Sequence, residues 1–151
     1  MADVSEQITN EHDVSRLCFG VPPGLAPESA FTFASSDRAE SAVWRKYAPQ
    51  PTDVHKRGCN IEIEKNARRL LKGVRPIKYI GFKTANVGAI REIKSEHGHQ
   101  FDVVHFPENG DLAHAHIVIT SAKKLTRNDV LELVALLLRR FSALKPYPES
   151  S

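Results

Sequence analysis

The sequence predicts one α+β domain, a two-layer α/β arrangement in which helices cover a small mixed sheet. Two observations lead to this fold class. Residues 77–106 give strand, helix and strand signals in that order, which is typical of a β-α-β unit. The residues after them give a hairpin and then a long amphipathic C-terminal helix. A chain of 151 residues fits a single domain of this kind.

The N-terminal third gives the weakest signals. Residues 1–13 are polar and predict a flexible tail, followed by one domain over 14–146 and a second tail over 147–151. Within the domain, apolar runs predict strands at 16–21 and 30–34. Ser35-Ser36-Asp37 then favours a short helix over 38–47, which ends before Pro49.

A longer helix is predicted over 54–72, although Gly58 weakens its first half. Its apolar stripe consists of Ile63, Ala67, Leu70 and Leu71, and Gly73 stands at the position of a C-cap. We therefore expect this stripe to cover the sheet. The next segment, 77–84, reads as a largely buried strand.

The following elements form the predicted β-α-β unit and hairpin. A helix is expected over 89–97 and a strand over 101–106, with a right-handed crossover that makes this strand parallel to 77–84. Asn109-Gly110 then indicates a tight turn into a strand over 113–120. The last helix is expected over 127–144, with Thr126 as its N-cap.

This order brings several polar residues to one end of the predicted sheet. Asn86 and Gly88 follow one strand, His105 ends the next, and His114 and His116 begin the third. We expect His105, His114, His116 and Asn86 to be candidate catalytic residues. The N–H groups near Gly88, at a helix start, would bind an anion. The alternative is that these histidines are polar surface residues or hydrogen-bonded pairs.

The sequence gives only incomplete patterns for three further kinds of chemistry. The three histidines His105, His114 and His116 resemble a zinc ligand set, but no carboxylate has ligand spacing, so no metal or other cofactor is assigned. Cys59 has His55 one helical turn away, although a half-buried thiol explains it equally well. Nucleotide-phosphate loops, zinc-protease motifs and the serine-hydrolase elbow are absent. Leu112 stands where a histidine-triad hydrolase has its first histidine, which excludes that family.

The net charge of +3 is unevenly distributed. Residues 56–83 carry nine Lys or Arg against two Glu, a net charge of +7. We expect this segment to be a binding surface for nucleic acid or an acidic protein. Its alternative is a solvated helix face with pairs such as Glu64 and Arg68. The expected contact residues are Arg57, Arg68, Arg69, Lys72, Arg75 and Trp44.

Composition excludes several classes of protein. Hydrophobic residues make up 41% and charged residues 26%, and no apolar run reaches the length of about 18 residues that a membrane span needs. The acidic start does not read as a signal peptide. Two cysteines, Cys18 and Cys59, are expected to be free thiols. We therefore expect a cytoplasmic protein that does not bind membranes.

Four segments carry a family resemblance: ESAVWRKYAP (40–49), TANVGAI (84–90), FDVVHFP (101–107) and LAHAHIVI (112–119). Their order is similar to that of a loose group of small bacterial proteins without an assigned activity. The matching positions are Ser41, Trp44, Asn86, Val87, Gly88, His105, Pro107, His114 and Ala115 or His116. The resemblance implies the same order of elements and the same polar cluster, and it implies a place among genome-defence components.

Taken together, these patterns favour a binding or interaction subunit with a protein partner, a second copy of itself, or nucleic acid as the bound molecule. The alternative is a small histidine-dependent enzyme that acts on an anionic or phosphate-bearing substrate at Asn86, His105 and His114.

Overall fold

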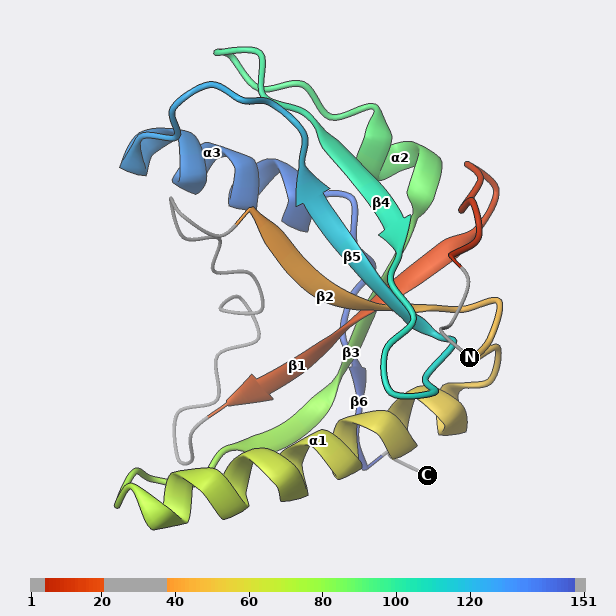
Figure 1. The fold of residues 1–151 in the computed structure, drawn as a ribbon, viewed down its shortest axis with the longest axis vertical. Helices are drawn as coiled ribbons and strands as arrows, with labels where there is room; N and C mark the ends of the chain where they lie inside the picture. The colour runs from red at the N-terminus through yellow and green to blue at the C-terminus, as the bar shows by residue number, and fades with distance from the viewer. Residues whose placement is uncertain (1–4, 21–37, 149–151) are drawn as a thin grey trace.

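The computed structural model describes residues 5–20 and 38–148, which form a six-stranded sheet with helices on both faces (Figure 1). The helices are α1 (Pro51–Leu71), α2 (Val87–Arg91) and α3 (Arg127–Leu138). This arrangement confirms the α+β class. The strands are β1 (Asp13–Gly20), β2 (Ala39–Trp44), β3 (Lys78–Asn86), β4 (Phe101–His105), β5 (His114–Ile119) and β6 (Lys145–Pro146).

The expectation of a mixed sheet is wrong, because every neighbouring pair of strands is antiparallel. The strand order is β4-β5-β2-β1-β3-β6. β3 and β4 do run in the same direction, as a β-α-β unit requires, but β5, β2 and β1 lie between them. The two N-terminal strands are inserted at this point, and no local pattern in the sequence indicates such an insertion.

The sheet divides where β1 meets β2. These strands pair only through Val14 with Trp44 and Ser15 with Val43. Beyond that point β1 continues along β3, β2 continues along β5, and the two strands point apart (Figure 1). The described part of the sheet is therefore a fork with two halves.

Each face of the sheet has its own apolar core. On one face, Leu17 and Val43 pack with Val54 of α1. On the other face, Val14 and Trp44 pack with residues of α2 and α3. Alternate residues of β1 and β2 thus point into opposite cores, as the period of two along a strand requires.

Two expectations for the N-terminal third are corrected. The helix expected over 38–47 is the strand β2, because its apolar residues face two different cores and satisfy β pairing better than one helix face. Residues 5–12 do not form a free tail, since Ile8 is buried and the carbonyl of His12 accepts a hydrogen bond from Val87 N. The strand expected over 30–34 lies outside the described residues.

The later elements agree better with the sequence. The Asn109-Gly110 turn has positive φ at both residues and joins β4 to β5 as a hairpin. Thr126 caps α3 as expected, but α3 ends at Leu138 rather than at 144. The expected 89–97 helix is only the five-residue α2, because the chain then turns and Lys94 pairs with Gln100.

Candidate functional site

The C-terminal half of α1 is attached to β3 through polar contacts. The Glu62 carboxylate accepts a hydrogen bond from Tyr79 N at 2.5 Å. The Asn66 side chain accepts from Ile77 N at 2.8 Å and donates to Ile77 O at 2.9 Å. These contacts occupy unpaired backbone groups at the start of the strand. They also turn the polar side of this half-helix toward the sheet.

The apolar side of the same half-helix is consequently exposed, which corrects the expectation that it covers the sheet. Ile63 is 67% exposed, Leu70 80% and Leu71 88%. Val74, 45% exposed, follows them, and its N–H donates to Arg69 O in the turn at Gly73 that follows the helix. Single exposed apolar residues are ordinary, but several on one helix face indicate an interaction site.

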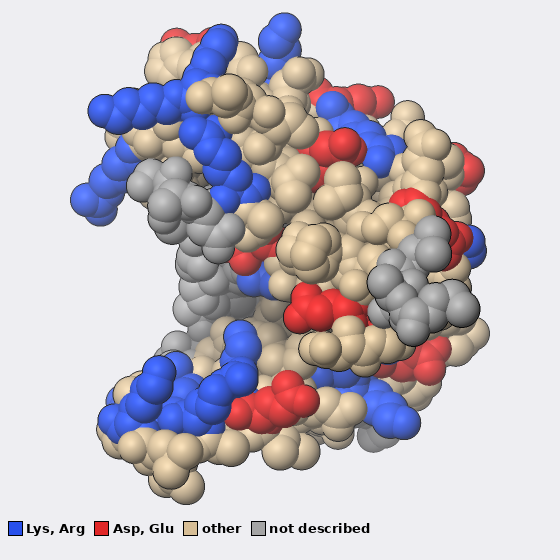
Figure 2. Space-filling view, viewed as in Figure 1, with Lys and Arg blue, Asp and Glu red and all other residues tan. Residues whose placement is uncertain are grey.

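Cations surround this apolar stripe. Arg68, Lys72 and Arg75 are exposed, while Arg69 is half-buried and donates from Nε to Arg75 O at 2.6 Å. Figure 2 shows blue side chains gathered over this end of α1. We call the stripe and its neighbours the α1 surface, defined by Ile63, Ala67, Arg68, Leu70, Leu71, Lys72, Val74 and Arg75.

Two expected binding residues lie elsewhere. Trp44 is 1% exposed and stacks edge-on against Tyr47 and His105, so it belongs to the core and not to a binding surface. Arg57 points into a groove on the other side of α1, where it forms an ion pair with Asp111.

His105 does not join a polar site. It is 4% exposed, and its Nδ1 accepts a hydrogen bond from Glu6 N at 2.8 Å. Its Nε2 then donates to Leu112 O, also at 2.8 Å. Cross-strand pairing of His105 with Ala115 places it on the face opposite His114 and His116. Both ring nitrogens are used in structural bonds, so His105 is a core residue.

Asn86 and Gly88 also serve the fold. The Asn86 side chain caps α2 by accepting from Ala89 N at 3.0 Å, and it donates to Asn10 O at 2.8 Å. Gly88 N donates to Asn10 O at 3.1 Å. The N-terminal segment therefore occupies the N–H groups that were expected to bind an anion.

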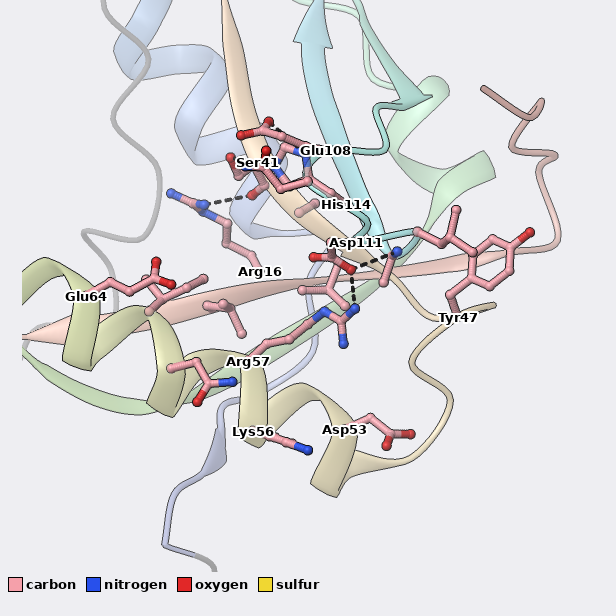
Figure 3. Close-up of a pocket in the computed structure, with 18 of the residues that line it drawn as sticks. Arg16, Ser41, Tyr47, Asp53, Lys56, Arg57, Glu64, Glu108, Asp111 and His114 are labelled. Carbon is pink, nitrogen blue, oxygen red and sulfur yellow. Dashed lines mark hydrogen bonds and ion pairs between the residues drawn. The ribbon is translucent and has the colours of Figure 1, made fainter. Parts of the chain in front are cut away.

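His114 lies in a groove of about 1010 Å³ between α1, the open face of the sheet and the β4–β5 turn (Figure 3). His116 is on the same face and stacks on Phe106 with ring centroids 4.3 Å apart. The structure thus keeps His114 and His116 together and separates them from His105 and Asn86.

The zinc alternative finds no support in this arrangement. Within residues 5–20 and 38–148, no group of three or more His, Cys, Asp or Glu side chains is placed to hold a metal ion. Over the same ranges, no helix has the length and apolar character to cross a membrane.

Comparisons with known proteins add no assignment. Family models, curated proteins and solved structures give no match to this chain. Two features of the structure are therefore the candidate functional sites, the α1 surface and the groove.

The sequence contains no local signal for the surroundings of three of these residues, Leu70, Leu71 and Ser41. Leu70 and Leu71 have the periodicity of a core stripe, and only the Glu62 and Asn66 contacts show which side of α1 faces the sheet. Ser41 appears in the sequence only as part of a Ser-x-x-Trp segment, and it reaches the groove through the pairing of β2 with β5.

Proposed function

We propose that this chain is a binding subunit that docks an acidic protein through the α1 surface. The observation that supports the proposal is the exposed apolar stripe on α1, bordered by Arg68, Lys72 and Arg75. An acidic amphipathic helix has the matching chemistry, because its apolar residues would cover the stripe and its carboxylates would meet the cations.

The apolar stripe of the α1 surface would supply binding affinity, and the cations beside it would select an acidic partner. Burial of one leucine side chain contributes about 1.5–3 kcal/mol, so covering Leu70 and Leu71 would offset part of the cost of association. Arginine is enriched among the residues that dominate interface energies. A second copy of this chain fits less well, since each copy would present the same cations to the other.

Nucleic acid is the second candidate for the bound molecule, and a separate observation favours it. Figure 2 shows Lys and Arg side chains on both sides of the hollow at the left of the molecule, over α1 and near the start of α3. Lys123, Lys124 and Arg127 are exposed there. A phosphate backbone would use these cations but would gain little from Leu70 and Leu71.

Fluorescence anisotropy with three labelled probes tests the proposal. The probes are a synthetic helical peptide with Leu and Glu along one face, a polyglutamate peptide, and a short DNA duplex. The Leu–Glu peptide should bind most tightly. Its affinity should fall at least about tenfold in Leu70→Ser/Leu71→Ser and in Arg68→Glu/Lys72→Glu, which corresponds to about 1.4 kcal/mol.

A matched control is Lys123→Glu/Lys124→Glu, which changes the net charge equally at a distant exposed site. It should leave peptide binding unchanged. Tighter binding of the DNA duplex, with a steep salt dependence and no effect of the leucine substitutions, would replace the acidic protein with nucleic acid. Equal loss of peptide binding in both charge variants would show only nonspecific attraction.

A further inference from the structure

Three side chains from different elements meet at the wall of the groove. Ser41 comes from β2, His114 from the start of β5, and Glu108 from the turn before it. His114 Nε2 lies 3.2 Å from Ser41 Oγ, and His114 Nδ1 lies 3.5 Å from Glu108 Oε2. Figure 3 shows the three residues side by side at the upper edge of the groove.

The backbone fixes the tautomer of His114. Its Nδ1 lies 2.8 Å from Phe106 O, and a carbonyl oxygen can only accept a hydrogen bond. Nδ1 therefore carries the proton, and Nε2 presents its lone pair to the Ser41 hydroxyl. This is the tautomer that a general base needs in order to take a proton from serine.

The surroundings allow a substrate to reach this pair. The Ser41 residue is exposed, in contrast to the buried His105, whose nitrogens are both bonded to the backbone. Arg16 donates from Nη1 to Ser41 O at 2.7 Å and from Nη2 to the Glu40 carboxylate at 3.0 Å, so it holds the backbone of β2 in place at Ser41.

The lining of the groove favours an uncharged substrate. Five carboxylates and four cations line it, and two of the cations, Arg16 and Arg57, are already paired with Glu40 and Asp111. No net positive field therefore attracts a phosphate. The apolar wall residues include Leu17, Phe19, Ile61 and Leu112, which suit an acyl chain.

We propose that Ser41, His114 and Glu108 form a hydrolytic site for carboxylic esters with an apolar acyl group. Ser41 Oγ attacks the carbonyl carbon while His114 Nε2 takes the hydroxyl proton. The C–O bond to the alcohol breaks, and His114 returns the proton to the departing alkoxide. Water, deprotonated by His114, then hydrolyses the acyl-serine to the carboxylate and free Ser41. Glu108 is a positioning residue that stabilises the imidazolium.

The site is tested with p-nitrophenyl butyrate hydrolysis and with labelling by a fluorophosphonate, located by peptide mass spectrometry. The fluorophosphonate should modify Ser41. Ser41→Ala and His114→Ala should lower kcat/KM at least about 100-fold, the lower end of what general acid–base catalysis contributes. Added imidazole should restore part of the activity of His114→Ala, which a merely structural role would not allow.

Two further variants complete the test. Glu108→Gln should lower kcat with little change in KM. Ser142→Ala, a matched change at an exposed serine outside the groove, should leave hydrolysis unchanged. Hydrolysis that persists in Ser41→Ala, labelling at other residues, or absence of both reactions in the folded protein would overturn the proposal. The α1 surface plays no part in it, so the two proposals can fail separately.

Discussion

Asp129 joins two regions of the molecule through its carboxylate. Its Oδ2 accepts from Thr126 N at 2.9 Å and its Oδ1 contacts His97 Nδ1 at 2.6 Å. The Thr126 hydroxyl in turn accepts from Asp129 N at 3.1 Å, which completes a capping box at the start of α3. The carboxylate therefore ties α3 to the turn before β4.

The Asp129–His97 pair makes the free energy of unfolding depend on pH, both at low pH and at higher pH. The hydrogen bond to His97, followed by those to Thr126, lowers the pKa of Asp129 below its ordinary value of 3.8. The stability it contributes is present above that value and is lost as pH falls through the folded pKa. The same bond raises the pKa of His97 above 6.5, so its contribution is full below 6.5 and is lost as pH rises through the folded pKa.

Urea denaturation across pH measures both contributions. We expect the free energy of unfolding of the parent to be highest between the two ordinary pKa values, 3.8 and 6.5. Asp129→Asn should be less stable in that range and should lose less stability on acidification. His97→Gln is the comparison variant: it should remove the decline at higher pH and reduce the acid-side decline only in part, because the Thr126 hydrogen bonds to Asp129 remain. A parallel pH profile for parent and Asp129→Asn would contradict this account.

At the scale of elements, α1 approaches β3 very closely at Gly58. A Cβ atom at this position would lie 2.3–2.5 Å from ring atoms of Tyr79. Tyr79 is itself buried and hydrogen-bonded to His55 at 2.8 Å, so its ring has little freedom to move. Gly58 thus allows the close packing of α1 on the sheet, although glycine disfavours a helix.

Gly58→Ala should therefore destabilise the protein, even though alanine is the better helix former. Overpacking of this kind costs about 1–3 kcal/mol, which exceeds the gain of about 1 kcal/mol in helix propensity. Urea denaturation measures the change, and Asn60→Ala at an exposed position of α1 should stay within about 0.5 kcal/mol of the parent. A more stable Gly58→Ala protein would contradict this expectation and show that the Tyr79 ring moves to make room for the added Cβ atom.

The sequence predicted those elements whose signals are local. The Asn109-Gly110 turn and the Thr126 cap depend on neighbouring residues, and both are confirmed. The identity of β2 and the orientation of α1 depend on distant partners, β5 and the start of β3, and both expectations were wrong. Periodicity showed that α1 has an apolar side, but it did not show what that side contacts.

For the molecule as a whole, the fork in the sheet determines where the candidate sites lie. The two halves are joined at the Ser15–Val43 and Val14–Trp44 pairs, beside Arg45. Arg45 donates to Ser15 Oγ at 3.2 Å, to Ala48 O at 2.8 Å and to Pro49 O at 2.8 Å. It thereby links β1 to the connection between β2 and α1.

The residues that line the groove are also brought together by the pairing of strands that are distant in the sequence. Ser41 and His114 are 73 residues apart, and β2–β5 pairing alone brings them together. The predicted cluster of Asn86, His105 and His114 assumed that β3 and β4 are neighbours. The insertion of three strands between them separates Asn86 from the histidines. His105 and His114 lie on neighbouring strands, but the pairing of His105 with Ala115 places them on opposite faces of the sheet.

Amide NMR of the full chain measures whether the α1 surface is the docking face that we propose. A labelled sample is titrated with the synthetic Leu–Glu helical peptide, and the perturbed amides are mapped onto the structure. We predict that the largest changes occur at Ile63, Leu70, Leu71 and Val74 and at the cations beside them. Changes centred on Lys123–Arg127, or spread evenly over all basic residues, would contradict the account.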